Sequence, residues 1–468
     1  MIQAADSGVV AVEQDTTPSE RAATGAAESS QLHALLLLAA LAGALVSQGA
    51  YYRQAQGPVM VLLAGALIAA LRADPLSVAD LRFAPLAGCA ALAGWVTVRA
   101  AAAGDVVDGI GAVALIAGVV TTVIVARRTS DVEAIGAGAV GLGVLTALTG
   151  WIGVAWRISP WALKDQGLWR AATSVTYANA GAAVLGALTL VAIARLVARP
   201  GSRATALSVC MLLTGLGATL SRGGLLAAAV GALALAALLG IGAVARAVLA
   251  PAVGAAIALA GLVPSISAGS RPRPVIALVA LLGGLALAGS LLSAAHLRRV
   301  FVLVTLSIVA GVAFASADGW HSAAAVRERR LTAASPDRTN AVRAALRLVD
   351  QHPLVGVGPG RARLSWTTRD GTTLVARYAH NEYLQVLLEL GAVGLVLLLA
   401  VLIAVARSVR HGRVHHIAVP LWAGATAGLV ALAVGSGLDF LWHVPAVPLV
   451  AGLLFGITVP KTKESKDP

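Results

Sequence analysis

The sequence predicts an all-α polytopic membrane protein with about 12–14 transmembrane helices and one long extracytoplasmic loop that carries an amphipathic helix. Of its 468 residues, 58% are hydrophobic and only 12% are charged, and the mean hydropathy is +0.84. An ordinary soluble domain has about 25% charged residues. The chain therefore has too little polar surface for a water-facing globule, which excludes a soluble nucleic-acid binder, a disordered chain and a disulfide-rich secreted scaffold.

Apolar stretches long enough to cross a bilayer recur along almost the whole chain. A spanning helix needs about 20 apolar residues and satisfies its backbone groups internally. This criterion predicts spans near residues 32–49, 57–71, 84–103, 106–126, 134–156, 173–194, 204–220, 224–245, 247–265, 275–294, 300–316, 382–406, 417–436 and 443–459. The organisation is then a disordered cytoplasmic tail at 1–31, transmembrane helices one to eleven within 32–316, an extracytoplasmic loop at 317–381, C-terminal transmembrane helices within 382–459, and a cytoplasmic tail at 460–468.

The distribution of basic residues predicts the orientation. With the N-terminus inside, arginine and lysine are concentrated in the cytoplasmic turns, for example at Arg127, Arg128 and Arg407 and in the tail from Lys461. This is the bias that the positive-inside rule describes. Both termini are then cytoplasmic in a multi-pass membrane protein.

Residues 317–381 form the one long hydrophilic connection, and on this orientation it lies outside. It has ten arginines against five acidic residues. This excess of positive charge has two interpretations, which composition leaves open: binding to anionic lipid headgroups, or an anionic substrate held at the outer surface. Within the loop, residues 338–351 have apolar positions at helical spacing, with Asp337 as N-cap, which predicts an amphipathic helix on the membrane surface.

Several segments resemble one family when they are taken together and in order. They are TYANAGAAVLG at 176–186, SRGGLLA at 221–227, DRTNAVRAALRLVDQHPLVGVGPG at 337–360, AHNEYLQVLLELGAVGLVLLL at 379–399 and GLDFLWHVPAVPLVAGLLFG at 437–456. This combination resembles the O-antigen ligase/polymerase family of bacterial membrane glycosyltransferases. The resemblance covers roughly residues 170–459. One departure is Val342, where the family often has a tryptophan four residues after the loop arginine.

The resemblance implies the multi-span membrane glycosyltransferase fold and a reaction at the outer face of the bacterial cytoplasmic (inner) membrane, with residues 317–381 as the catalytic loop. The family's donor is a glycan on a polyprenyl diphosphate, typically undecaprenyl diphosphate, and its acceptor is a glycan, a lipid or a protein hydroxyl. The transfer it implies is inverting and metal-independent, with no cofactor and no nucleic acid. It fixes neither the sugar nor the choice between single ligation and polymerisation.

Such a reaction needs cations that hold the leaving diphosphate, and three arginines are candidates. Arg222 lies at the outer end of a span beside two glycines, which allow a bound anion to approach the backbone; the alternative is an arginine that snorkels to the interface. Arg338, at the start of the loop helix, is the second candidate clamp, although an exposed surface arginine would look the same. Arg343 follows at helical spacing and faces either substrate or headgroups.

The reaction also needs a base, and His380 is the candidate. It directly precedes a long apolar helix, and a histidine there can accept a proton near neutral pH. Asn381, Glu382 and Tyr383 are candidate substrate-binding residues, as are Asn179 and Arg343. Asn381 is also a candidate helix cap, and Glu382, in the first turn with Tyr383, is placed to orient the imidazole. Asn179, in an otherwise apolar span, is predicted to face a cavity or to bond a neighbouring helix.

Other acidic residues have weaker patterns. Asp439, in LDFLWH, is interpreted as structural, and Asp105 and Asp108 share an outer turn that offers at most a weak cation site. The outer loop has no metal-ligand spacing, and the chain has no phosphate-binding P-loop.

Two other classes compete with the enzyme. A transporter or flippase of lipid-linked glycans also needs many spans and a cationic cavity, and a scaffold for envelope assembly needs no chemistry at all. Transporters tend to have inverted repeats and charges near the bilayer midplane. Here no internal repeat is apparent, and the candidate charges gather at one face. That asymmetry favours the glycosyltransferase.

Overall fold

The computed structural model describes residues 18–77, 80, 83–290, 336–368, 371–415 and 418–459. The predicted span at 300–316, the first part of the predicted loop and the C-terminal tail lie outside these residues. Within them the α-helices are α1 Pro18–Val46, α2 Arg53–Ala73, α4 Ala84–Ala103, α5 Val106–Arg128, α6 Val132–Trp156, α7 Ala178–Ala198, α8 Arg203–Ala218, α9 Arg222–Leu239, α10 Ile241–Ile266, α11 Pro274–Gly289, α14 Pro336–Gln351, α15 Glu382–His415, α16 Val419–Ser436 and α17 Ala446–Thr458.

The prediction of an all-α polytopic membrane protein is confirmed. Among the described helices, 9 are long and apolar enough to cross a membrane, and four more are apolar but shorter. Most predicted spans coincide with these helices within a few residues. Three begin elsewhere: α1 starts at Pro18, inside the stretch predicted as a tail, α7 starts at Ala178 because a short hairpin precedes it, and α10 starts at Ile241, before the predicted span at 247–265.

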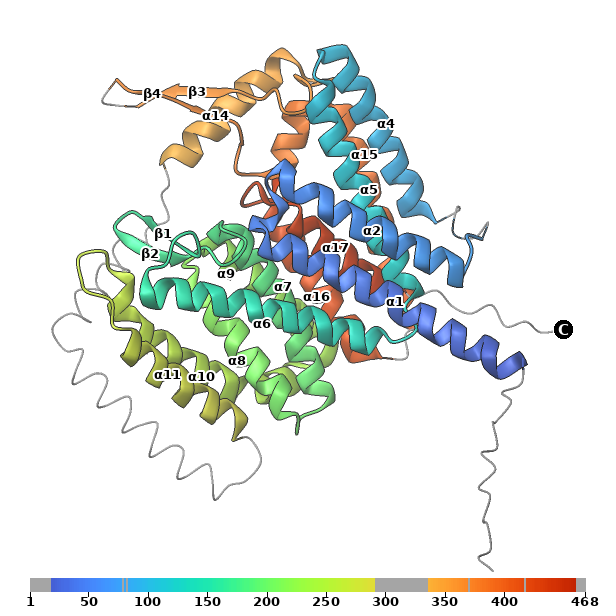
Figure 1. Cartoon of the computed structure of the whole chain (residues 1–468). Helices are drawn as coiled ribbons and strands as arrows, with labels where there is room; N and C mark the ends of the chain where they lie inside the picture. Colours follow the sequence, from blue (N-terminus) through green and yellow to red (C-terminus); the bar gives the residue numbers. More distant parts are fainter. Residues whose placement is uncertain are drawn as a thin grey trace, which may run out of the picture.

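The centre of the molecule is α7, which is buried along almost its whole length by α16, α9 and α8 (Figure 1). Small residues make this packing close, since a Cβ atom at Gly428 of α16 would lie 3.2 Å from the carbonyl oxygen of Ala187. Close approach of backbones through glycine and alanine is the usual way in which membrane helices associate. The N-terminal end of α7 is thereby fixed between α9 and the turn that follows α16.

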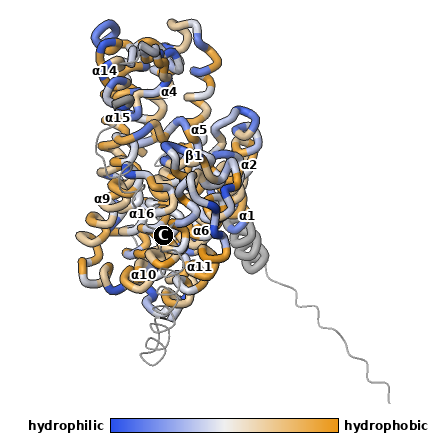
Figure 2. The backbone as a smooth tube through the Cα atoms, turned by 90° about the vertical axis from the view of Figure 1, so that its left-hand side faces the viewer, coloured by the Kyte–Doolittle hydropathy of each residue, from blue (hydrophilic) through white to orange (hydrophobic). Residues whose placement is uncertain are grey.

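Two short antiparallel hairpins, which the sequence pattern does not predict, interrupt the helices. β1 (Ala162–Asp165) and β2 (Leu168–Ala171) connect α6 to α7, and β3 (Leu364–Thr367) and β4 (Thr373–Ala376) lie between α14 and α15. The hydrophilic positions of α14 lie at one end of the helical body, as Figure 2 shows.

The loop helix α14 covers residues 336–351, where a helix is predicted. Other parts of the protein pack against its apolar face. The buried alanines of α14, Ala341 and Ala345 among them, pack against Leu364 of β3 and against Ala379 and Leu388. The prediction of an amphipathic helix is therefore confirmed, and protein packs against its apolar face. That the helix lies on or near the membrane surface stays a prediction.

Helix α15 is broken at Gly391, and the turn that follows α14 fills the break. Gly391 has φ 70° and ψ −171°. The freed backbone groups are bonded by the turn: the amide of Ala392 donates to the carbonyl of Pro353 (2.8 Å), and the amide of Gly358 donates to the carbonyl of Glu389 (2.9 Å). This interlock fixes the loop against the first turns of α15.

Gly391→Ala is expected to destabilise the protein by about 1–3 kcal/mol, because alanine disfavours this backbone conformation. A Cβ atom there would also meet the backbone of Leu354. Gly141→Ala is the matched control, since Gly141 lies exposed within α6 and a Cβ atom there meets no atom within 4 Å. Thermal unfolding of the purified variants measures the difference. Equal midpoints for the two variants would contradict the interlock.

Candidate active site

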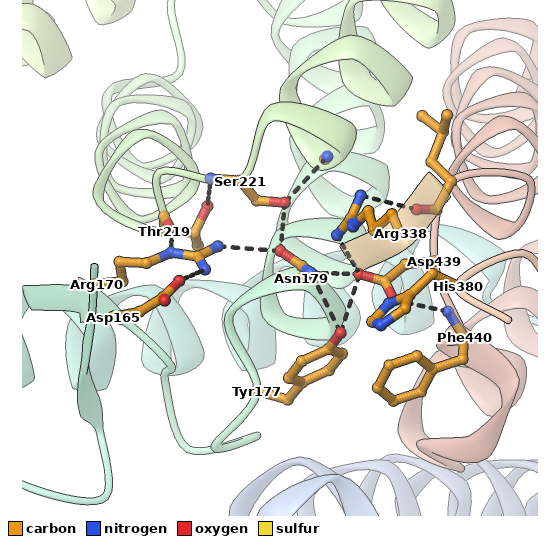
Figure 3. A network of polar contacts seen from close by, with 12 residues as sticks. Asp165, Arg170, Tyr177, Asn179, Thr219, Ser221, Arg338, His380, Asp439 and Phe440 are labelled. Atoms are coloured by element: carbon orange, nitrogen blue, oxygen red, sulfur yellow. Dashed lines mark hydrogen bonds and ion pairs between the residues drawn. The ribbon is translucent and has the colours of Figure 1, made fainter. Parts of the chain in front are cut away.

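Three segments that are distant in sequence from Asp439 bring side chains to its carboxylate. Asp439 lies in the turn after α16, and its side chain is only 5% exposed. Around it lie Asn179 from α7, Arg338 from α14 and His380 from the residue pair before α15 (Figure 3). Arg222, the first residue of α9, lines the same cavity as Asp439 and Arg338.

Both oxygens of the Asp439 carboxylate are fully engaged. Oδ1 contacts Nδ1 of His380 at 2.8 Å and accepts from the amide of Phe440 at 2.9 Å. Oδ2 accepts from the hydroxyl of Tyr177 at 2.9 Å, from Nη2 of Arg338 at 3.2 Å and from the amide group of Asn179. The interpretation of Asp439 as merely structural is therefore too narrow: it joins three of the candidate residues.

The electrostatic environment keeps Asp439 ionised. Burial opposes the charge, but the hydrogen bond from His380 and the charges of His380 and Arg338 outweigh it, so the pKa of Asp439 lies below its usual value. A carboxylate can only accept, so Nδ1 of His380 must carry the proton of their hydrogen bond. Nε2 is then the nitrogen of the ring that can accept a proton from a substrate.

The backbone holds His380 in an unusual conformation. Its φ is 52°, in the left-handed region that a residue with a Cβ atom rarely adopts. The next residue, Asn381, accepts from the amide of Leu384 at 3.0 Å and so caps α15 as predicted. The imidazole itself is 30% exposed, so it contacts Asp439 on one side and remains accessible on another.

A cavity of about 150 Å³ adjoins Asp439, and we call it the arginine cavity. The charged and polar residues that line it include Asp165, Arg170, Asn179, Ser221, Arg222, Arg338 and Asp439. The N-terminus of α9 lies at its edge, where Ser221 caps the helix by accepting from the amide of Gly224. Helix N-termini carry partial positive charge, which adds to that of the arginines and favours a bound anion.

The arginines are held by different contacts. Arg338 bonds Asp439 and the carbonyl of Leu438 (3.3 Å) and is 41% exposed, so part of its guanidinium group faces the cavity. Arg170, on β2, pairs with Asp165 at 2.8 Å and donates to the side-chain oxygen of Asn179 at 3.0 Å. Sequence reasoning missed Arg170, because a hairpin with strands of four residues leaves no recognisable alternation.

Asn179 links the two halves of this network. Its side-chain oxygen accepts from Arg170 and, at 2.8 Å, from Ser221, while its amide group donates to Asp439 and to Tyr177. The prediction that this asparagine faces a cavity or bonds a neighbouring helix is therefore confirmed on both counts. It ties the start of α7 to the start of α9.

Residues 274–399 match the model of the family described as O-antigen ligase. This segment is similar to the O-antigen ligase family. The matched segment is about a quarter of the chain, and it contains Arg338 and His380 but not Arg222 or Asp439. No curated protein sequence matches the chain.

Three residues of the O-antigen ligase segment lie apart from the arginine cavity, contrary to expectation. Glu382 is 1% exposed and does not orient His380, because Asp439 does; instead it accepts from the amide of Trp442 and pairs with Nδ1 of His443 at 3.3 Å. Tyr383 donates to the carbonyl of Ala433. Arg343 is exposed and lines neither of the two cavities described for this protein.

The carboxylates that sequence analysis offered as a cation site have other partners. Asp105 caps α5, and Asp108 pairs with Arg53 at 2.9 Å. Over the described part of the chain, no group of three or more His, Cys, Asp or Glu side chains is arranged to hold a metal ion. That the reaction is independent of a metal stays a prediction.

Proposed function

We propose that this chain is a membrane glycosyltransferase that moves a glycan from a polyprenyl-diphosphate carrier to an acceptor hydroxyl at the outer face of the bacterial cytoplasmic membrane. The observation that carries the proposal is the juxtaposition of the arginine cavity with the His380–Asp439 pair. A cationic cavity suits a leaving diphosphate, and an oriented imidazole suits the deprotonation of a hydroxyl. The similarity of residues 274–399 to the O-antigen ligase family supports the same class of reaction.

In the proposed step, the acceptor hydroxyl gives its proton to Nε2 of His380 while its oxygen attacks the anomeric carbon. The new carbon–oxygen bond forms on the face opposite the diphosphate. The bond between the anomeric carbon and the diphosphate oxygen breaks, and its electron pair leaves with the diphosphate. Because attack and departure occur on opposite faces, the anomeric configuration inverts.

Each side chain then has a defined part in the reaction. Asp439 fixes the ring of His380 and stabilises the imidazolium that forms, as a buried carboxylate does for other catalytic histidines. Arg338 and Arg222 hold the diphosphate, with Arg170 and the N-terminus of α9 nearby. These groups supply the positive charge that a divalent metal brings in other phosphate-transferring sites, so we propose a metal-independent reaction.

Arg338→Ala and Arg222→Ala are expected to weaken donor binding and turnover together, each about 10- to 100-fold. The basis is the loss of a charge-assisted contact of about 1.5–3 kcal/mol in both the ground state and the transition state. Lysine should restore only part, because a point charge cannot reproduce the planar fork of arginine. The measurements are the affinity of the purified variants for polyprenyl diphosphate and their rate of transfer.

Arg343→Ala is the control for Arg338→Ala. It removes an arginine from the same helix, five positions along, where the side chain is exposed and lines neither cavity. Its binding and turnover should stay close to those of the unmodified chain. If Arg338→Ala bound polyprenyl diphosphate as well as Arg343→Ala does, the diphosphate would not lie in the arginine cavity.

A further inference from the structure

A second and larger cavity, which the proposed reaction does not use, lies among α2, α4, α5 and α15. Its volume is about 510 Å³, within the range of small-molecule sites. The side chains that line most of it are apolar, among them Leu92, Val96, Leu115, Val386 and Leu390. We call it the apolar cavity. All four helices are candidate membrane spans, so a hydrocarbon chain suits both its lining and its surroundings.

One end of the apolar cavity is polar and built from buried side chains. Glu382 is 1% exposed and Gln385 is 2% exposed. The amide group of Gln385 donates to Glu389 at 2.7 Å, and Nδ1 of His443 lies 3.3 Å from Glu382. The hydroxyl-bearing ring of Tyr378 also lines this end. Ionisable groups in apolar spans are costly to bury and usually mark functional sites.

The charges of the two cavities differ. In the arginine cavity, arginines outnumber carboxylates: Arg170, Arg222 and Arg338 against Asp165 and Asp439. The apolar cavity has equal numbers of basic residues and carboxylates: Arg53, Arg377 and His443 against Asp108, Glu382 and Glu389. Burial lowers the pKa of His443, but the hydrogen bond and charge of Glu382 and the charge of Glu389 outweigh it and raise the pKa. The polar end therefore has no excess of positive charge for a diphosphate, and its carboxylates and amides suit hydroxyl groups instead.

The two cavities meet at the turn 439–443, and two residue pairs hold this turn against the start of α15. His380, which precedes α15, contacts Asp439, and Glu382, the first residue of α15, contacts His443. The ring of Phe440 lies between the pairs, with its centroid 5.0 Å from that of His380 and 4.6 Å from that of Tyr378. The proposed base thus lies next to the arginine cavity, and Tyr378, two residues earlier, lines the apolar one.

We infer that the apolar cavity binds the acceptor: a lipid with a single hydrocarbon chain in the cavity and an uncharged, hydroxyl-bearing head group at its polar end. The word acceptor rests on the proposed function, whereas the binding site itself does not. The donor diphosphate and the acceptor chain then occupy separate cavities on either side of the turn 439–443. Such a division leaves the acceptor hydroxyl as the group that approaches His380.

Gly111 of α5 offers a direct test. It lines the apolar cavity, and a Cβ atom built there meets no atom within 4 Å, so Gly111→Phe places a ring in open space. Gly141→Phe is the matched control, because Gly141 is equally unobstructed, lies in α6 and lines neither cavity. The probe is a photoreactive alkyl glycoside with one uncharged chain, added to each variant in lipid nanodiscs. Polyprenyl diphosphate binding is measured in parallel.

The expected result is labelling of α5 or α15 in the unmodified chain and in Gly141→Phe, and labelling at least tenfold lower in Gly111→Phe. Polyprenyl diphosphate should bind all three equally. Undiminished labelling of Gly111→Phe would overturn the site. Loss of polyprenyl diphosphate binding in Gly111→Phe would also overturn the inference, because the cavity would then hold the donor chain. If polyprenyl diphosphate binds none of the three while labelling follows the expected pattern, the proposed donor fails and the amphiphile site stands.

Discussion

His380→Ala is expected to lower the turnover of glycan transfer by about 10²–10⁴, the usual contribution of a general base. Donor binding should change little, because the arginines and the N-terminus of α9 remain in place. The reason for the split is that the imidazole acts on the acceptor proton in the transition state, whereas the diphosphate is held before and during the reaction. Single-turnover transfer and polyprenyl diphosphate affinity, measured on the same purified protein, separate the two effects.

His352→Ala serves as the control for this variant. His352 lies in the turn after α14, is exposed and lines neither cavity, so its loss should leave turnover nearly unchanged. Near-normal turnover of His380→Ala would remove the histidine from the chemistry and leave the arginines alone to support an enzyme.

Asp439→Asn should reduce turnover by a similar factor of about 10²–10⁴ while keeping the shape of the side chain. The substitution removes the charge that stabilises the imidazolium. It also offers Nδ1 of His380 an amide donor, which favours the tautomer whose proton is on Nε2 and which cannot accept another there. The neutral asparagine also cannot form the ion pair that Asp439 makes with Arg338, so the affinity for the donor should fall modestly. Asp350→Asn, an exposed change in α14, is the control.

The pH dependence of stability gives an independent test of whether the Asp439 carboxylate is ionised in the folded chain. Its pKa is lowered in the folded chain, so its ionised form contributes stability above the pKa of an unfolded aspartate, about 3.9. This contribution is lost as the pH falls through the lower folded-state value. Thermal midpoints of the unmodified chain and Asp439→Asn should therefore differ most near neutral pH and converge below about pH 4. A constant difference across that range would contradict the ionised, buried carboxylate.

The fold was largely accessible from sequence, because hydropathy reports directly on helices that must satisfy their backbone groups in lipid. Arg222, Arg338 and Asn179 were also accessible, since a charge or an amide in or beside an apolar segment is conspicuous. All three line the arginine cavity. The β-hairpins were not, because four-residue strands between helices give no periodic signal.

Hydrogen bonds between residues that lie far apart in the sequence could not be predicted either. Asp439 looks like an isolated acid in a turn, yet its partners His380 and Tyr177 lie 59 and 262 positions away. Glu382, two residues from His380, suggested the wrong partner, because its side chain points to the far side of the turn and binds Trp442 and His443. The apolar cavity could not be predicted from sequence, since the residues that line its apolar part are indistinguishable from those of a packed core.

The most direct test of the proposed function is an assay of glycan transfer by the purified chain in nanodiscs, without nucleotide and in the presence of a metal chelator. A labelled glycan on polyprenyl diphosphate is the donor, and an alkyl glycoside, a second lipid-linked glycan and a hydroxyl-containing peptide are offered in parallel as acceptors. The proposed function predicts that at least one acceptor gains the glycan with inverted anomeric configuration and that free polyprenyl diphosphate is released in equal amount. Movement of the intact donor between leaflets without release of polyprenyl diphosphate, or transfer that returns only when a divalent metal is restored, would contradict it.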